Sequence, residues 1–335
     1  MLYITTRSDH DTYTAQRALK ESAAPDGGLY LPMRWGRLSP SEIRTLLEAG
    51  NPEICAAILN YSFSLRLTAR DAEFVLGKRM AVLKQMSHRI TVAECWRNPE
   101  GEFTRTERIM AKLAAVDKRQ TPVGQWLKVV SRICLLFCLF AEMDRQGGLP
   151  EGTTVDTVVG GGDFTGPVAA WYAREMGLPV GNILYCGKDA EALWDLLQTG
   201  QLRLDRTNPA APGMEQLIRI CLGAREARSF ASAVDQERVY QLGKGISKPF
   251  EGLQASVIRD QRIPGIISNV YATNGYVLGP ESAVLYAGLM DYRARAGSGG
   301  AALIVSQTSP VHGADTVAQA LDLTKDQLQE HLNRM

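Results

Sequence analysis

The sequence predicts an α/β protein, built on a mainly parallel sheet with helices on both faces, and three observations support this prediction. An apolar, β-rich run at 154–159 is followed by a tight glycine loop at 160–166 and then by a helical pattern. A second buried strand pattern at 182–186 is again followed by a helix. A helical run from Glu281 precedes a further apolar strand at 301–306. Strands that alternate with helices are typical of a parallel sheet covered by helices.

Composition and charge restrict the class of protein. The chain has 335 residues, of which 45% are hydrophobic and 22% charged, as in globular proteins and unlike disordered or fibrous ones. Its net charge of +1 provides no overall field that would attract nucleic acid or an anionic membrane. The longest apolar run, 133–141, is too short to span a bilayer, and no basic-then-apolar leader opens the sequence. We therefore expect a cytoplasmic protein without nucleic-acid or membrane partners.

The cysteines and histidines do not form a metal-binding pattern. Cys134 and Cys138 lie four residues apart in a helical stretch, where cysteine behaves as a small hydrophobic residue. The four histidines are scattered, and no Cys-x-x-Cys pair occurs. We expect no metal site and a set of reduced core cysteines. The cysteines are Cys55, Cys95, Cys134, Cys138, Cys186 and Cys221.

Residues 1–88 predict a helical module with a two-stranded ribbon. The runs 3–6 and 29–31 have the composition of strands. Ser39 and Thr68 are N-cap residues in front of helical patterns. The helices expected in this module cover residues 14–23, 40–48, 52–62 and 69 to about 85.

The remaining elements divide the chain further. We expect a short middle part at 89–127 and a large α/β domain at 128–335, which contains the glycine loop. The patterns predict a strand at 90–96 and helices at 106–117, 123–145, 281–292 and 316–334, with mostly helix and proline breaks at 200–250.

The glycine loop, residues 160–166, admits two interpretations. Its glycines allow backbone N–H groups to converge at a helix N-terminus, a geometry that suits a phosphate. The same residues are equally typical of a tight strand-to-helix connection, and the loop matches neither a dinucleotide nor a Walker spacing. Asp163 within the loop would repel a phosphate at short range.

This region resembles the threonine synthase family, pyridoxal-phosphate enzymes of the tryptophan-synthase-β fold type (fold type II). The family loop Ser-Gly-Asn-Phe-Gly-Asp corresponds to Gly161-Gly162-Asp163-Phe164-Thr165-Gly166, and the following helix ends in Met176-Gly177-Leu178-Pro179 as the family helix does. The N-terminal segments Tyr3 to Arg7 and Ala24 to Pro32 are similar to the family's ribbon. Further similar segments are 211–215, 275–284 and 306–310.

The resemblance fails where the family carries its catalytic lysine. The family motif Glu-Leu-Phe-His-Gly-Pro-Thr-Leu-Ala-Phe-Lys-Asp-Phe aligns without a gap to residues 94–106, and the lysine position is Thr104. A hydroxyl group cannot form the Schiff base from which this chemistry starts. The family's small cofactor subdomain is also expected to be missing, because only 24 positions separate Thr104 from Lys128. Residues 89–127 would then be the remnant of the lysine-bearing subdomain and its linker.

The resemblance implies a set of ligand-binding residues but no catalytic one. Gln307 stands where the family has a threonine against the cofactor ring. We expect no covalently bound pyridoxal phosphate, whereas phosphate or sulfate is expected to bind the glycine loop weakly. The implied cofactor- or phosphate-binding residues are Gly161, Gly162, Asp163, Phe164, Thr165, Gly166, Ser306, Gln307 and Thr308.

Three functions remain open at this point. The first is a catalytically inactive threonine-synthase-like protein with a ligand-binding, regulatory or scaffolding role. The second is a pyridoxal-phosphate-dependent lyase of the threonine synthase type, which converts O-phosphohomoserine to threonine, using a partner chain or another lysine such as Lys188 or Lys248. The third, an unrelated enzyme on the same sheet, has no convergent catalytic group to support it. We favour the first.

Loss of the small subdomain also predicts self-association. It would expose an apolar face on the large domain, and a symmetric homodimer is the commonest way to cover such a face. The alternative is that the shortened segment folds onto its own core. The apolar residues available for either cover are Phe103, Ile109, Met110, Leu113 and Trp126.

Overall fold

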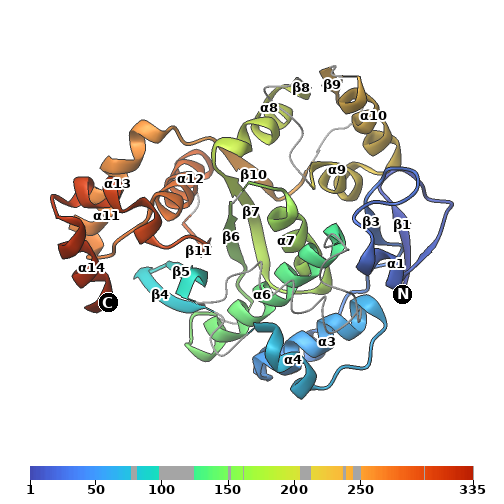
Figure 1. The fold of residues 1–335 in the computed structure, drawn as a ribbon, viewed down its shortest axis with the longest axis horizontal. Helices are drawn as coiled ribbons and strands as arrows, with labels where there is room; N and C mark the ends of the chain where they lie inside the picture. The colour runs from blue at the N-terminus through green and yellow to red at the C-terminus, as the bar shows by residue number, and fades with distance from the viewer. Residues whose placement is uncertain are drawn as a thin grey trace.

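A six-stranded sheet in the order β10-β7-β6-β11-β5-β4 crosses the middle of the computed structural model (Figure 1). Its strands are β4 (Val82–Ser87), β5 (Ile90–Glu94), β6 (Val155–Val159), β7 (Val180–Cys186), β10 (Leu253–Ser256) and β11 (Ala301–Ser306). The structure describes residues 1–76, 81–97, 124–149, 152–160, 162–203, 213–236, 239–243, 250–297 and 299–334.

The five strands from β10 to β5 are parallel, and β4 is antiparallel to β5. The side chains of β11 alternate between the two faces, with Leu303 and Val305 in one apolar core and Ala302 and Ile304 in the other. A strand buried on both faces needs a continuous run of apolar residues, which explains why this segment has no polar positions before Ser306.

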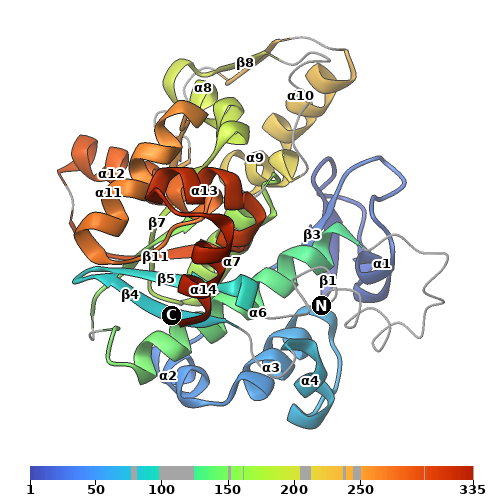
Figure 2. The same ribbon diagram turned by 60° about the vertical axis from the view of Figure 1, so that its left-hand side comes forward.

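Helices cover both faces of the sheet. One face packs against α6 (Gln125–Arg145), α7 (Thr165–Met176) and α8 (Glu191–Thr199). The other packs against α11 (Ile263–Asn274), α12 (Pro280–Ala296), α13 (Ala314–Leu321) and α14 (Lys325–Arg334), which Figure 2 brings forward. The predicted architecture, a mainly parallel sheet between two helical layers, is confirmed, as are the strands expected near 155–159, 182–186 and 301–306.

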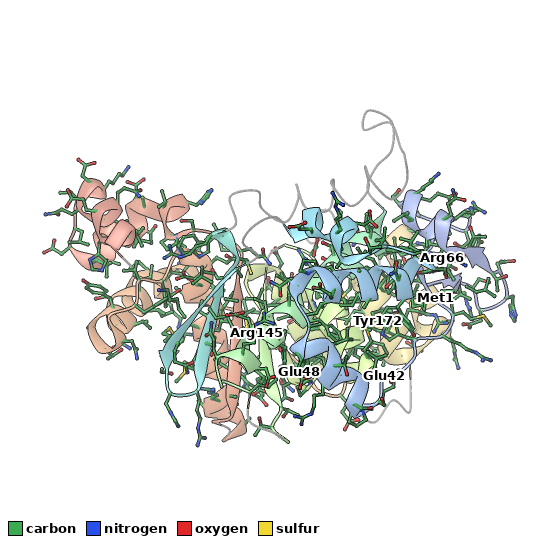
Figure 3. All side chains as sticks on the ribbon, turned by 90° about the horizontal axis from the view of Figure 1, so that it is seen from below. Met1, Glu42, Glu48, Arg66, Arg145 and Tyr172 are labelled. Carbon is green, nitrogen blue, oxygen red and sulfur yellow. The ribbon has the colours of Figure 1, made fainter. Side chains whose placement is uncertain are left out.

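The N-terminal module packs on the α6 side of the sheet. Its helices are α1 (Ala15–Lys20), α2 (Pro40–Glu48), α3 (Asn51–Phe63) and α4 (Ala69–Leu76). Ser39 and Glu42 form a capping box at the start of α2, as the sequence led us to expect of Ser39. Arg145, at the end of α6, donates hydrogen bonds to the Ala49 carbonyl and the Asn51 side chain, so α2 and α6 lie side by side (Figure 3).

The ribbon of the module has three strands where the sequence predicted two. The predicted pairing is confirmed, because β1 (Leu2–Thr5) pairs antiparallel with β3 (Tyr30–Pro32). The two-residue strand β2 (Tyr13–Thr14) adds to the other side of β1.

One predicted helix in this part of the chain begins at Ala69 as expected but extends too far in the prediction. Residues 82–87 form β4 and not the end of a helix reaching Gln85, because pairing with β5 overrides the helical pattern. The central sheet therefore begins inside the stretch assigned to the N-terminal module. The domain boundaries at residues 88 and 127 stay a prediction.

A small lobe beyond α8 completes the described chain. It contains the hairpin of β8 (Gln201–Arg203) and β9 (Val239–Gln241) together with α9 (Met214–Leu222) and α10 (Ala224–Asp235). The described residues between 200 and 250 are therefore mostly helical, as predicted, apart from this hairpin. Among the described residues, 3-10 turns follow strands or precede helices. They are η1 (Cys95–Arg97), η2 (Lys188–Ala190), η3 (Asp260–Arg262) and η4 (Pro310–Gly313).

Trp126 is a core residue and not part of an exposed apolar face. It is 1% exposed and packs edge-on against Tyr3, Trp35 and Tyr172. Its Nε1 donates a hydrogen bond to the Tyr3 hydroxyl over 2.8 Å. Phe103, Ile109, Met110 and Leu113, like the helix predicted at 106–117, lie outside the described residues.

Within the described ranges, no helix combines the length and the hydropathy that crossing a lipid bilayer requires. The same ranges contain no cluster of three or more histidine, cysteine, aspartate or glutamate side chains placed to hold a metal ion.

Candidate ligand site at the carboxyl edge of the sheet

The carboxyl ends of four parallel strands meet at one edge of the sheet. β5 ends at Glu94, β6 leads into the glycine loop, β7 ends at Cys186, and β11 ends at Ser306. Ligands of open α/β sheets bind at this edge, so the sequence-predicted residues at 162–166 and 306–308 lie where a ligand site is expected. Gly161 and Thr104 lie outside the described residues.

The glycine loop holds a carboxylate of its own at the start of α7. Gly162 has φ +77°, which turns the chain so that the Asp163 side chain folds back over the helix N-terminus. Asp163 Oδ1 accepts hydrogen bonds from the Thr165 backbone N–H over 3.0 Å and from the Thr165 hydroxyl. The carboxylate therefore takes the place that an external anion would occupy against these donors.

Arg132, on α6, supplies the matching positive charge. Its Nη1 lies 2.8 Å from Asp163 Oδ1, and both side chains are largely shielded from solvent. The same Nη1 is 3.4 Å from the point where a Cβ at Gly166 would stand, so the guanidinium lies directly over the first turn of α7. The negative charge of Asp163 in the loop is thus balanced by Arg132 of the same chain.

The second predicted segment, at 306–308, is also bound by a carboxylate of this chain. Glu281 Oε2, from the first turn of α12, accepts the backbone N–H of Gln307 over 2.9 Å and that of Thr308 over 2.5 Å. Ser306 is buried, and its hydroxyl has no hydrogen-bond partner. The amide groups of this segment therefore bind Glu281, as those of the glycine loop bind Asp163.

Tyr185, near the end of β7, brings a polar group beside the loop. Its ring lies 4.6 Å from that of Phe164, and its hydroxyl is buried without a hydrogen-bond partner. Burial, and then the carboxylates of Asp189 and Asp163, raise the pKa of Tyr185 far above its usual range. The hydroxyl therefore keeps its proton at any physiological pH and is a hydrogen-bond donor.

Glu94, at the end of β5, is the third carboxylate of this edge. It is 2% exposed and binds the Tyr276 hydroxyl over 2.7 Å, and Arg97 forms an ion pair with its other oxygen. Burial first, and then the charge of Glu94, raise the pKa of Tyr276. Both oxygens of the Glu94 carboxylate therefore have a partner within this chain, which is typical of a carboxylate with a structural role.

A small cavity lies beside these groups in the described part of the chain. It has a volume of about 20 Å³ and is lined by α6, the start of α7 and the end of β11, including Arg132, Gly160, Gly166 and Gln307. A space of this size holds one water molecule.

Of the two lysines that the sequence offers in place of the family's Schiff-base residue, Lys188 is described and Lys248 lies outside the described residues. Lys128, on α6, is a further lysine near the loop. Lys188 follows β7 on η2, as predicted, but its side chain is 69% exposed and forms an ion pair with Asp260. Lys128 lies one turn before Arg132 on α6 and is half-buried, so it is on the same side of that helix. Neither lines the cavity at the glycine loop.

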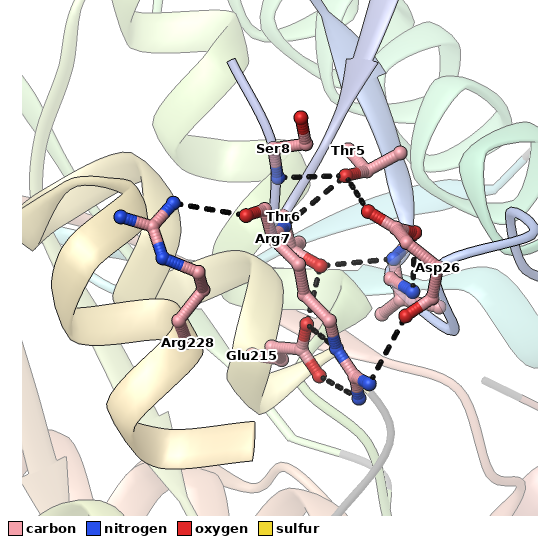
Figure 4. A network of polar contacts seen from close by, with 9 residues as sticks. Thr5, Thr6, Arg7, Ser8, Asp26, Glu215 and Arg228 are labelled. Atoms are coloured by element: carbon pink, nitrogen blue, oxygen red, sulfur yellow. Dashed lines mark hydrogen bonds and ion pairs between the residues drawn. The ribbon is translucent and has the colours of Figure 1, made fainter. Parts of the chain in front are cut away.

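The glycine loop is supported from behind by α9. Gly213, which precedes α9 with φ +88°, packs so closely that a Cβ there would lie 3.1 Å from the Phe164 carbonyl carbon. Glu215, in the first turn of α9, binds Arg7 through two bonds of 3.0 and 3.1 Å (Figure 4). The N-terminal ribbon therefore anchors the helix on which the loop rests.

Sequence reasoning missed the residues that fill this site. Arg132 and Glu281 stand in ordinary helical patterns, and no motif marks them. The only available signal was Asp163 itself, because a carboxylate in a phosphate-type loop needs a positive partner nearby.

Comparisons with known proteins agree with this architecture. A family model described as threonine synthase N terminus matches residues 2–74. Threonine synthase-like 1 from Pongo abelii is 24% identical over 177 residues, and the human protein of that name is 23% identical. Each match covers 48% of this chain and 23% of the relative, so the matched region spans about a quarter of those proteins.

Solved structures match almost the whole chain. A PLP-bound threonine synthase from Brucella melitensis has a TM-score of 0.76 at 17% identity, over 96% of this chain and 91% of that one. The yeast threonine synthase has a TM-score of 0.77 at 15% identity, over 96% and 90%. Residues 2–74 therefore match the threonine synthase N-terminal family, and the chain as a whole has the fold of the threonine synthases.

Proposed function

We propose that this chain is a threonine-synthase-like protein that does not catalyse pyridoxal-phosphate chemistry and acts by binding a ligand or partner in a regulatory or scaffolding role. The observation that supports the proposal most directly concerns Asp163. Its carboxylate accepts hydrogen bonds from Arg132 and from the Thr165 donors at the start of α7. An enzyme that held a phosphate there would need those donors for the phosphate.

The chain between β5 and α6 supports the same proposal. Residues 98–123 are all that connects η1 to the residue before α6, and a βαβ unit needs about 30 residues. This length supports the proposal that the small subdomain, which would form the other wall of the cleft, is missing, and a lyase would then need a partner chain to replace it.

The alternative function is a pyridoxal-phosphate-dependent lyase with another lysine. Lys188 is a poor candidate, because Asp260 pairs with its ammonium group and solvent surrounds it. Lys128 is better placed, since it shares a side of α6 with Arg132. Both lysines are therefore included in the test.

The test is a spectrum of the purified full chain with one equivalent of pyridoxal phosphate, before and after borohydride, followed by peptide mapping. We expect no stable aldimine absorbance and only the dispersed surface labelling that any lysine-bearing protein shows. A threonine synthase treated in parallel is the positive control, and a Lys128→Arg, Lys188→Arg variant is the matched control for this chain.

A stoichiometric reduced adduct on one lysine, lost in the double variant, would overturn the proposal in favour of the lyase. An adduct on a lysine outside the described residues would overturn it equally.

A further inference from the structure

A cavity of about 320 Å³ lies beside β10, at the edge of the sheet. This volume is in the range of small-molecule sites, and none of its lining residues belongs to the cavity at the glycine loop. Its walls come from α8, from the chain leading into β10 and from the end of α12. The lining residues that matter below are Trp194, Leu197, Glu251, Ala255 and Arg295.

The hydrogen bonds of β10 leave one side of this strand unpaired. The Gly252 carbonyl accepts the Ile183 N–H over 2.7 Å, and the Ser256 carbonyl accepts the Gly187 N–H over 3.2 Å, so these positions point toward β7. Backbone groups alternate in direction along a strand, and β10 has no partner on its other side among the described strands. The N–H and C=O of Ala255 therefore face the cavity.

Arg295 carries the charge that gives the cavity its chemistry. Its guanidinium lies 5.1 Å from the centroid of the Trp194 ring, and its Nη2 donates a hydrogen bond to Ser256 Oγ over 3.3 Å. Because α8 and α12 cover opposite faces of the sheet, this contact passes around the free edge of β10.

No carboxylate pairs with Arg295 in the described part of the chain. Asp291, one turn earlier on α12, is bound by Arg262 through two bonds of 2.7 and 3.0 Å. Most of the five N–H donors of Arg295 thus remain for a ligand. A guanidinium held in place by an aromatic ring is suited to a carboxylate. The lining is mostly polar, and its apolar part, at Leu197 and the portion of the Trp194 ring that Arg295 leaves uncovered, suits a small apolar body.

We infer that this cavity binds a small monocarboxylate with an apolar or aromatic body, its carboxylate on Arg295 and its body against Trp194 and Leu197. Glu251, exposed at the rim, disfavours a second carboxylate on the ligand. The inference does not depend on the proposed function, since a working cofactor site at the glycine loop would leave this cavity unchanged.

The experiment titrates phenylacetate into the full chain and measures binding by ligand-observed NMR, with 2-phenylethanol as the uncharged analogue and phenylsuccinate as the dianion. We expect phenylacetate to bind in the millimolar range usual for fragments of this size and to bind about tenfold more tightly than either analogue. Arg295→Gln should remove this preference for the monoanion.

Arg259→Gln is the matched control, because Arg259 is exposed just after β10 and its loss changes the net charge equally. Trp194→Phe, which keeps a ring under the guanidinium, should weaken binding by no more than a few fold. Equal binding of phenylacetate to the wild-type, Arg295→Gln and Arg259→Gln proteins would overturn the inference. So would equal binding of the acid and the alcohol, or no detectable binding to a folded wild-type chain.

Discussion

At the scale of single residues, the arrangement that most affects the chemistry is Asp163 with Arg132. A carboxylate at a helix N-terminus is stabilised by the helix dipole, by the Thr165 donors and by the guanidinium 2.8 Å away. A side chain of the same shape without the charge would compete less for those donors and for Arg132, so an external anion could bind them.

Asp163→Asn should therefore tighten phosphate binding at residues 162–166. We expect roughly a tenfold change, since one charge-assisted contact is gained and one repulsion is lost. Isothermal titration with inorganic phosphate measures it. Arg132→Gln combined with Asp163→Asn is the control, and it should return the affinity to the wild-type level. Unchanged affinity in Asp163→Asn would mean that the loop is a structural turn only.

Cys186 predicts a pH dependence of stability. Burial raises the pKa of its thiol from an ordinary 9.0 to about 12, and Arg295 opposes this only in part. The folded thiol stays protonated where the unfolded thiol ionises, so its contribution is fully present below about pH 9 and is lost as the pH rises toward 12. Burial of Tyr3 and Tyr172, which raises the pKa of both, acts in the same direction.

Urea unfolding at about pH 8 and about pH 10 checks this expectation, with a lower midpoint at the higher pH. Cys186→Ala should be less stable than the wild-type protein at both pH values, because Sγ packs against Gly288. Its stability should fall less from the lower pH to the higher one, since the thiol is absent. Identical losses in the two proteins would show that the thiol does not contribute.

At the scale of elements, the start of α9 packs against the glycine loop and holds it in place. Gly213 has φ +88° and stands with no room for a Cβ against Phe164 and Thr165, whereas Gly275 has φ +66° with nothing within 4 Å. Alanine at Gly275 would add only the free-energy cost of a left-handed backbone, whereas alanine at Gly213 would add that cost and a steric clash as well.

Gly275→Ala should destabilise the protein by about 1–2 kcal/mol, the usual penalty for a left-handed alanine. Gly213→Ala should cost about 1 kcal/mol more, because the loop has to move. Denaturant unfolding measures both, and hydrogen exchange at residues 162–166 should accelerate only in Gly213→Ala. Equal costs with unchanged exchange would contradict the role assigned to α9.

The elements also show where prediction from sequence succeeds. The strands of the core were predictable because β6, β7 and β11 are rich in buried apolar residues, and α7 ends at Gly177 with φ +110°, a residue type that marks such an end. β4 was not, since its assignment depends on pairing with β5 and on nothing in its own pattern. The partners of Asp163 and of residues 307–308 were likewise invisible, because Arg132 and Glu281 approach from elements distant in sequence.

At the scale of the whole molecule, the homodimer stays a prediction, and fewer residues are available to form its interface. Trp126 is in the core of its own subunit, so it cannot contribute to a face between copies. Sedimentation velocity of the full chain at micromolar concentration measures the state directly. We expect a dimer, and a monomer across the whole concentration range would remove the argument for an uncovered face.

The place of β11 in the sheet has a consequence for how the chain reaches its folded state. β11 lies between β5 and β6 and pairs with both, Ala302 opposite Ile90 on one side and Leu303 opposite Thr157 on the other. Until residues 301–306 emerge from the ribosome, β5 and β6 each present an open strand edge. A nascent chain in this condition folds slowly and associates readily through those edges. A stop codon anywhere before residue 301 therefore removes the middle of the sheet and not its border, and the product would be degraded or aggregate during synthesis.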